Sequence, residues 1–255
     1  MLGLASWAAA RDADSVEHLE TAIRKNPRDE RSRLALSRVL SSAGRDSDAE
    51  RVLLDTISAL PESVRAYWWL GAEYERLNRP ADARAAFERA AMAATAGHAF
   101  IYAAIGRLAR HAGDISGASD AFLRAVAARP GDAVLRKALA GVFLQQDRAD
   151  DALIELRAAL RIDARDAAAF AAIGQIHLNA GRHDDAVESL RRAIDLSGTD
   201  LGARYALATA LRRLGRTTEA ETEFARVEQA QRRDLDERRR TMVGEVQKEE
   251  AARGR

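Results

Sequence analysis

Cysteine is absent from the 255-residue sequence. The chain therefore cannot form a disulfide, use a thiolate nucleophile or hold a metal ion through cysteine. Proline is scarce, with four residues, and aromatic residues make up only 5% of the chain. The core must therefore be built mainly from alanine and leucine, which is typical of an all-helical protein.

An excess of either charge is also missing, because 40 Lys and Arg residues face 39 Asp and Glu residues. Bulk charge thus gives no attraction to nucleic acid or to a membrane surface. No apolar run reaches the roughly 20 residues that a membrane span needs. The mildly apolar start, residues 2–10, has no preceding basic segment of the kind that a signal peptide carries. We expect a cytoplasmic protein, and a periplasmic one stays open if the chain is a fragment that lacks its signal.

Several residue columns recur at a spacing of 34 residues, with a single step of 35. The clearest column holds a small residue: Ser15, Ala49, Ala83, Ala118, Ala152, Ala186 and Ala220. A large apolar residue follows four positions later: Leu19, Leu53, Phe87, Phe122, Leu156, Leu190 and Phe224. A spacing of four residues puts both columns on one stripe of a helix.

A second apolar stripe precedes the first in every repeat. It holds an aliphatic residue followed by a small one, as in Leu70 and Gly71 or Ile105 and Gly106. Between the two stripes stands a residue that tolerates the left-handed backbone conformation, as the end of a helix requires. These residues are Gly44, Asn78, Gly113, Asp147, Gly181 and Gly215. Each repeat is therefore predicted to be a pair of antiparallel helices, and such pairs must stack to bury their apolar stripes.

Two stretches carry enough of these columns to resemble a known family. They are Tyr67, Leu70, Gly71, Tyr74, Ala83, Phe87 and Ala90, and then Tyr102, Ile105, Gly106, Ala118, Phe122, Ala125 and Pro130. Both look like the tetratricopeptide repeat (TPR). The resemblance implies an all-α, right-handed superhelical stack of antiparallel helix pairs. The sequence departs from the family at the first aromatic column, where Arg33, Arg136 and Arg204 replace the bulky residue, and we expect looser packing there.

The spacing divides most of the chain into six full repeats. Their ranges are 30–63, 64–98, 99–132, 133–166, 167–200 and 201–234, after a partial TPR-like unit in 1–29 that has Leu2 and Gly3 in the Leu-Gly columns. Residues 235–255 continue as a charged C-terminal helix or tail. We expect this segment to act as a solvated cap of the stack. A short coiled coil or docking helix through Leu235, Met242 and Val246 is the alternative.

No catalytic constellation is visible, so we expect the chain not to be an enzyme and to use no cofactor. There is no glycine-rich phosphate loop and no nucleophile elbow. His177 and His183 lie close to Asp184 and Asp185, but His177 occupies an aromatic packing column. The aspartates suit the start of a helix, where negative charge is favoured. We therefore expect no metal site.

The informative surface is the side of each first helix that faces away from the core, at repeat positions 2, 5, 9 and 12, with 6 and 13 at its edge. In proteins that resemble TPR arrays this side lines the concave groove where partners bind. Nine basic residues lie there against one acid, Glu75: Arg31, Arg38, Arg65, Arg76, Arg107, Arg110, Lys137, Arg212 and Arg213. The aromatic residues Trp68, Trp69, Phe100 and Tyr205 join them.

The cations outside the last helical turns and these aromatic residues form the predicted partner-binding groove: Arg31, Arg38, Arg65, Trp68, Trp69, Phe100, Arg107, Lys137 and Tyr205. Exposed tryptophan beside arginine is typical of binding hot spots. We expect a scaffold or adaptor that binds a protein segment or peptide, an acidic one because the groove is basic. Two alternatives stay open: an RNA-binding helical repeat, and the interaction arm of a larger enzyme. TPR arrays that clamp a chaperone's C-terminal carboxylate resemble a pattern with Lys at repeat position 5 and Asn at position 9. That pattern is missing here, because the repeat with Lys137 at position 5 has Gly141 at position 9.

Overall fold

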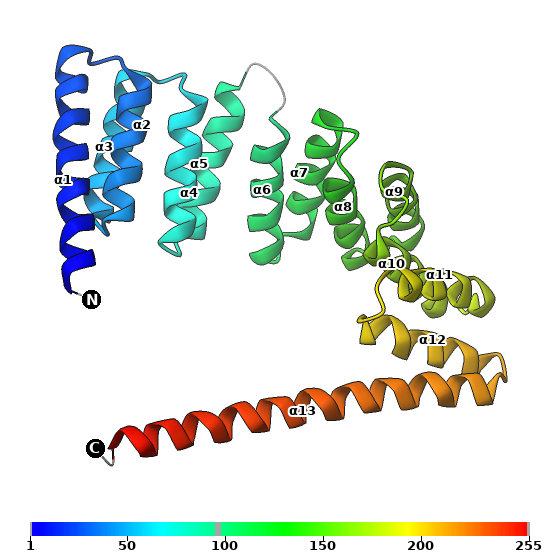
Figure 1. The fold of residues 1–255 in the computed structure, drawn as a ribbon. Coiled ribbons are helices and arrows are strands. Elements are labelled where there is room, and N and C mark those ends of the chain that lie inside the picture. Colours follow the sequence, from blue (N-terminus) through cyan, green and yellow to red (C-terminus); the bar gives the residue numbers. More distant parts are fainter. Residues whose placement is uncertain (1, 95–97, 254–255) are drawn as a thin grey trace. The chain divides into compact units, whose positions relative to one another are not determined.

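The computed structural model describes residues 2–94 and 98–253, with side chains between 14–94 and 98–242. Within these residues the chain forms thirteen α-helices and no strand (Figure 1), which confirms the predicted all-α repeat stack. The helices are α1 (Leu2–Lys25), α2 (Glu30–Ser42), α3 (Asp46–Ala59), α4 (Val64–Arg76), α5 (Pro80–Ala93), α6 (Ala99–His111), α7 (Ile115–Ala128), α8 (Ala133–Gln145), α9 (Ala149–Ile162), α10 (Ala167–Asn179), α11 (His183–Leu196), α12 (Leu201–Arg213) and α13 (Thr217–Arg253). In this described part, no helix combines the length and the apolar character needed to cross a bilayer.

Five of the six first helices of the full repeats begin with a side-chain cap, and α6, which follows His98, does not. Asp29, Ser63 and Asp132 accept hydrogen bonds from the free backbone N–H groups at the starts of α2, α4 and α8. Asp166 and Asp200 do the same for α10 and α12. Such caps stabilise a helix by about 1 kcal/mol. They place the start of the helix at the first residue of the predicted repeat in each of these cases.

The turns inside the repeats use the residues that the sequence indicates. All six predicted positions have a positive φ angle: Gly44, Asn78, Gly113, Asp147, Gly181 and Gly215. Asn78 at +56° and Asp147 at +59° are the positive-φ residues other than glycine in the described part. Asparagine and aspartate tolerate this conformation better than other side chains do. The turn residue thus ends one helix and lets the next return antiparallel to it.

The small-residue column is where the paired helices meet. Ala49, Ala83, Ala118, Ala152 and Ala186 are 0% exposed. The partner helix approaches closely at the other small column, where a Cβ atom on Gly71 would lie 2.5 Å from the Phe87 ring. Alanine and glycine therefore set the distance between the helices, and the large residue of each repeat fills the remaining space.

Residues 2–25 form one continuous helix, α1. Ala10 stands 34 residues before the turn residue Gly44, and α1 continues through it. The physical reason is local: the other turns have Gly, Asn or Asp at positive φ, whereas alanine strongly favours helix and disfavours that conformation. The predicted Leu2 and Gly3 packing lies outside the described side chains.

The arginines of the first aromatic column have a structural role that the sequence did not reveal. The Nε atom of Arg33 donates to the carbonyl oxygen of Pro27 at 2.8 Å, and Arg136 donates in the same way to Pro130 at 2.9 Å. Arg204 contacts the carbonyl oxygen of Gly198 and pairs with Glu223 at 3.0 Å. In these three repeats the guanidinium therefore fastens the loop that leads into the helix.

The chain divides into two compact bodies, Met1–Gln146 and Asp147–Arg255, called here the N-terminal and C-terminal bodies. The N-terminal body holds α1 to α8, with a buried cluster around Phe87, Leu70 and Ile101. The C-terminal body holds α9 to α13, with a buried cluster around Leu190, Leu207 and Leu211. In α13, Ala220 and Val227 are buried, whereas all of the residues 231–242 are exposed.

The two described apolar residues of the proposed coiled coil are exposed, Leu235 by 64% and Met242 by 65%. Val246 lies outside the described side chains. The helical course of the segment agrees with the sequence expectation, and its function as cap or docking helix stays a prediction.

Candidate partner-binding face

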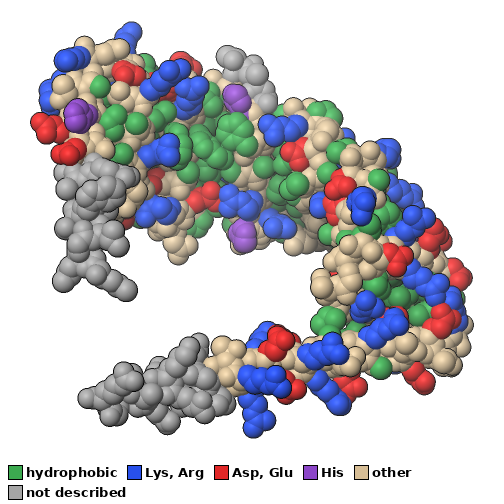
Figure 2. All heavy atoms as spheres, in the orientation of Figure 1, with side chains coloured by type: hydrophobic (Ala, Val, Ile, Leu, Met, Phe, Trp, Pro, Cys, Tyr) green, Lys and Arg blue, Asp and Glu red, His purple; other side chains and the backbone are tan. Residues whose placement is uncertain are grey.

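The first helices α2, α4, α6 and α8 of the N-terminal body each turn one side away from the core. We call this the first-helix face, formed by repeat positions 2, 5, 6, 9, 12 and 13 of these helices. Figure 2 shows hydrophobic side chains gathered on one side of this body with arginines around them. The face combines apolar and cationic groups, as the sequence predicts.

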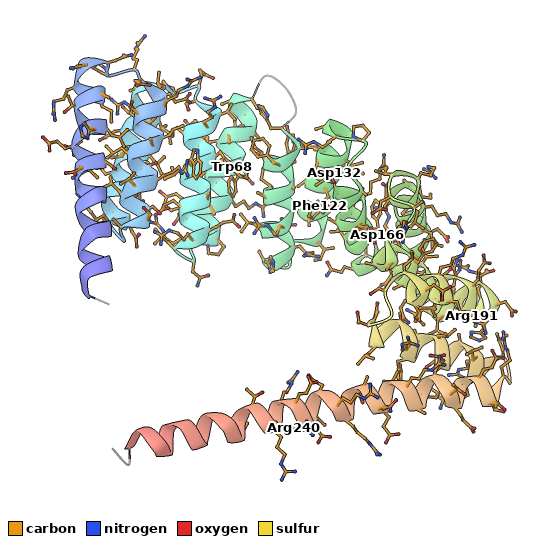
Figure 3. The ribbon with its side chains drawn as sticks, in the orientation of Figure 1. Trp68, Phe122, Asp132, Asp166, Arg191 and Arg240 are labelled. Atoms are coloured by element: carbon orange, nitrogen blue, oxygen red, sulfur yellow. The ribbon has the colours of Figure 1, made fainter. Side chains whose placement is uncertain are left out.

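An aromatic cluster joins two neighbouring repeats on this face. Trp68 of α4 lies 4.8 Å from the Phe87 ring and meets Phe100 of α6 edge-on, with ring centroids 4.6 Å apart. Trp68, which is labelled in Figure 3, is half-buried, while Phe100 remains 43% exposed. The ring of His98 also lies against Phe100, with the ring centroids 5.5 Å apart and the planes tilted by 50°. Trp68 therefore anchors the cluster in the core, and Phe100 offers its ring to solvent.

Trp69 points toward α2 instead. The guanidinium carbon of Arg38 lies over its ring, 5.2 Å from the centroid. A guanidinium at this distance from a tryptophan face is held by a cation–π interaction. Neither tryptophan is fully buried, so both contribute surface to the face.

Two of the predicted groove cations, Arg107 and Arg65, already have carboxylate partners, and so does Arg76, a basic residue of the face that lies in a last helical turn. Arg107 binds both carboxylate oxygens of Glu75, at 2.6 and 3.0 Å. Arg65 lies 3.5 Å from Glu30. These pairs join α4 to α6 and α2 to α4, so they tie adjacent repeats together.

Arg76 is the third paired cation. It pairs with Glu73 at 2.6 Å and with Asp46. The hydrogen bonds to the two carboxylates raise the pKa of Arg76, that to Glu73 most strongly. These partners do not belong to the face that the sequence defines, because Glu30 and Glu73 occupy repeat positions 1 and 10 and Asp46 begins a second helix.

Arg31, Arg38 and Arg110 make no ion pair with the described residues of the chain. Arg31 and Arg38 are exposed on α2, and Arg110 is half-exposed in the last turn of α6. Lys137 of α8 interacts with another residue of the chain, so it is not counted with these three cations. The cationic character of the face is therefore concentrated on α2, rather than spread evenly over the predicted residues.

Tyr205 belongs to the C-terminal body, on the equivalent side of α12. It is 55% exposed and packs edge-on against Phe224 of α13 at 5.4 Å. Together with Thr209, Arg213 and Gln175 it lines a cavity of about 480 Å³. Tyr205 thus contributes to a surface of α10 and α12.

The histidines offer no metal site. In the part of the chain that the structure describes, no group of three His, Asp or Glu side chains could hold a metal ion. His177 is 7% exposed, which confirms the prediction of a packing residue, and its Nδ1 accepts a hydrogen bond from Arg182 Nε at 2.9 Å. Burial lowers the pKa of His177, and the nearby charge of Arg182 lowers it further.

Comparison with known proteins agrees with this architecture. The family model for the tetratricopeptide repeat matches residues 34–99, 103–169 and 171–234. A comparison with curated protein sequences gives no significant match.

Solved structures show the same fold. YrrB, a TPR protein described as having an unusual peptide-binding site, is 22% identical, with a TM-score of 0.65 over 75% of this chain and 98% of YrrB. MamA from Desulfovibrio magneticus is 19% identical, with a TM-score of 0.62 over 66% of this chain and 95% of that one. A tetratricopeptide repeat protein from Parabacteroides merdae is 16% identical, with a TM-score of 0.62 over 85% of this chain and 80% of that one.

Proposed function

The chain belongs to the tetratricopeptide repeat family, and we propose that it is a non-catalytic scaffold whose first-helix face binds an acidic segment of a partner protein. The observation that carries the proposal is the grouping of exposed Phe100, half-buried Trp68 and Trp69, and unpaired Arg31 and Arg38 on one side of the N-terminal body. Aromatic rings supply contact area at little entropic cost, and arginine adds charge-assisted hydrogen bonds. The peptide-binding site described for YrrB is in keeping with this use of the fold.

The acidic preference rests on a narrower set of cations than the sequence indicates. Arg65 and Arg107 are paired with Glu30 and Glu75, so they add little net positive charge to the face. Arg31, Arg38 and Arg110 retain their charge toward an incoming segment. Such exposed charges mainly accelerate encounter, and their effect fades as salt screens them.

The test begins with a library of synthetic peptides of graded net charge, from which the chain itself selects a binder. The affinity of that peptide is then measured at low and high salt for the Arg31→Glu, Arg38→Glu double variant. The matched control is Arg89→Glu, Arg192→Glu, which makes the same change of charge at exposed positions of second helices. We expect acidic peptides to be selected, and the first variant to bind about tenfold or more weakly at low salt, with a smaller loss at high salt.

Phe100→Ala tests the aromatic contact without emptying the core. It should weaken binding at both salt concentrations, because buried apolar contact is not screened. Selection of neutral or basic peptides would refute the acidic preference. Equal loss in the two charge variants would show that the partner does not use this face. Binding of a mixed-sequence RNA oligonucleotide in place of peptides, lost at high salt, would replace the protein partner by nucleic acid.

A further inference from the structure

One residue of α4 breaks an otherwise apolar column. Repeat position 10 holds Val39, Leu108, Val142, Ile176 and Ala210 in the other five full repeats, but Glu73 in the second. Glu73 is only 7% exposed. Burying a carboxylate is costly unless it is paired, and the other repeats show that the fold does not need a charge there.

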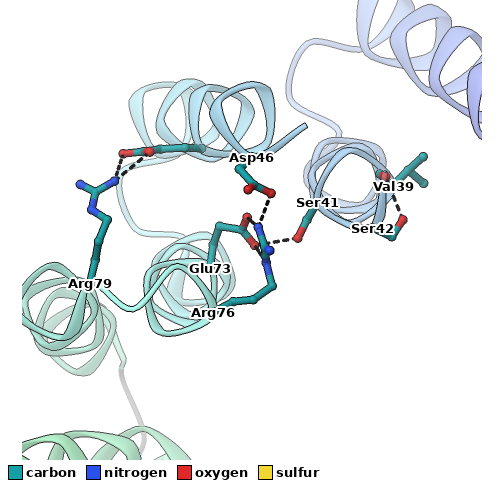
Figure 4. A network of polar contacts seen from close by, with 8 residues as sticks. Val39, Ser41, Ser42, Asp46, Glu73, Arg76 and Arg79 are labelled. Atoms are coloured by element: carbon teal, nitrogen blue, oxygen red, sulfur yellow. Dashed lines mark hydrogen bonds and ion pairs between the residues drawn. The ribbon is translucent and has the colours of Figure 1, made fainter. Parts of the chain in front are cut away.

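The contacts of Glu73 lie between α2, α3 and α4 (Figure 4). Its Oε2 atom accepts a hydrogen bond from the hydroxyl of Ser41 on α2 at 2.8 Å. Its Oε1 atom accepts one from Arg76 Nη2 at 2.6 Å, and Arg76 Nε also donates to Oε2 at 3.3 Å. The same Nη2 of Arg76 also binds Asp46 at the start of α3. One guanidinium is therefore shared between two carboxylates, which leaves this group of three with a net charge of −1.

A cavity opens beside this group. It has a volume of about 550 Å³ and is lined among others by Arg38, Ser41, Leu53, Trp69, Glu73 and Arg76. We call it the α2–α4 pocket. The cation that lies over the Trp69 ring is Arg38, an exposed side chain with no carboxylate partner among the described residues. The ring of Trp69 thus accommodates a cation. Arg38 fills this place from the exposed surface, and no carboxylate among the described residues holds it there.

We propose that the α2–α4 pocket receives one cationic side chain, a lysine or an arginine, of the segment bound on the first-helix face. The inference rests on the proposed function. The incoming group takes the place of Arg38 over Trp69 and donates to Oε1 of Glu73, which has one donor, whereas Oε2 already has two. It replaces Arg38 as the positive charge beside Glu73, Asp46 and Arg76, whose own net charge is −1. Arg38 is then free to pair with an acidic residue beside the lysine or arginine in the same segment.

A purely structural role for Glu73 makes a different prediction. Glu50 is its natural counterpart, because it also joins two repeats through a carboxylate, accepting from the Tyr74 hydroxyl at 2.8 Å and from Arg79. Glu50 does not line the pocket. If Glu73 were only such a tie, replacing either carboxylate should affect stability alone.

The experiment uses the full chain and a small probe, so it does not depend on finding the partner. The indole N–H signals of the three tryptophans are followed by NMR while Nα-acetyl-lysinamide is added. Nα-acetyl-norleucinamide and Nα-acetyl-glutamate amide serve as the neutral and anionic controls. The Trp69 signal is assigned from a Trp69→Phe variant. We expect a saturable shift of this signal with the lysine probe only.

Glu73→Gln should weaken binding of the probe by about tenfold or more, because the amide cannot replace a charge-assisted hydrogen bond. Glu50→Gln should leave it unchanged. If Glu73→Gln does not fold, Trp69→Leu takes its place, because it removes the aromatic ring and keeps the carboxylate. We expect this variant to bind the probe about tenfold or more weakly as well, measured by the shifts of the backbone N–H signals around Ser41.

The absence of a saturable shift, stronger binding of the anionic probe, or wild-type affinity in Glu73→Gln would each overturn the pocket. None of these results bears on the peptide selection that tests the face as a whole. Conversely, the lysine probe could bind while the affinity of the selected peptides is unchanged in the Arg31→Glu, Arg38→Glu variant. That result would support the pocket and refute the acidic preference of the face.

Discussion

The close approach of α4 to α5 at Gly71 permits a sharp test of the packing. A Cβ atom added to Gly71 would lie 2.5, 2.7 and 2.9 Å from three atoms of the Phe87 ring. That ring is 0% exposed and has Trp68 against it, so it has little room to retreat. Overpacking of this kind costs about 1–3 kcal/mol. Alanine in place of glycine returns roughly 0.5–1 kcal/mol through helix propensity. The net expectation for Gly71→Ala is a loss of up to about 2.5 kcal/mol, centred on roughly 1 kcal/mol.

Gly141 of α8 is the matched control, since a Cβ atom there would meet no atom within 4 Å. Gly141→Ala should therefore stabilise the protein by roughly 0.5–1 kcal/mol. Urea unfolding followed by circular dichroism measures both variants, and the two midpoints should move in opposite directions. If both variants gained stability, the close helix contact at Gly71 would be refuted. If both lost it, the open space at Gly141 would be refuted.

Two further predictions concern the C-terminal body. The pKa of His177 is lowered by burial, so the unfolded chain binds more protons than the folded one as the pH falls below the ordinary value of 6.5. The free energy of unfolding should therefore decrease from pH 7.5 to 5.5, and less so in His177→Gln; equal slopes in urea titrations would contradict this. Removing the chain from Arg216 onward should uncover the buried Leu207 and Leu211 on α12 and cost several kcal/mol, since each large aliphatic side chain contributes roughly 1.5–3 kcal/mol. A chain that ends after Gln231 is the control and should melt like the intact protein, because the described residues beyond it are exposed.

The helix pairs could be predicted because each column repeats along the chain. The six turn residues were predicted correctly, and the capping residues of α2 and α4 stand directly before the predicted starts of their repeats. Local chemistry decides these features, so periodic sequence is enough to find them. The course of α1 does not follow from the spacing alone, because Ala10, which stands 34 residues before Gly44, does not support a turn.

The charges of the candidate face were harder to predict, because a pair depends on two helices at once. Counting residues on the face finds Arg107 and Glu75 but does not reveal that they bind each other at 2.6 Å. It also omits Glu73, since position 10 belongs to the buried side of the helix. The strength of a basic stripe therefore depends on the register between neighbouring repeats, which the sequence of one helix does not contain.

Comparison among the repeats can still separate structural exceptions from functional ones. Arginine at the first aromatic column is an exception in three repeats, and in each its guanidinium contacts a loop carbonyl six residues earlier, as Arg33 does with Pro27. An exception that recurs with the same partner is explained by the fold. Glu73 is an exception in one repeat, it is buried, and it lines a cavity together with Arg38 and Arg76. The other five full repeats stack without a carboxylate at this position, so we attribute Glu73 to what the α2–α4 pocket binds, beyond its contacts with Ser41 and Arg76.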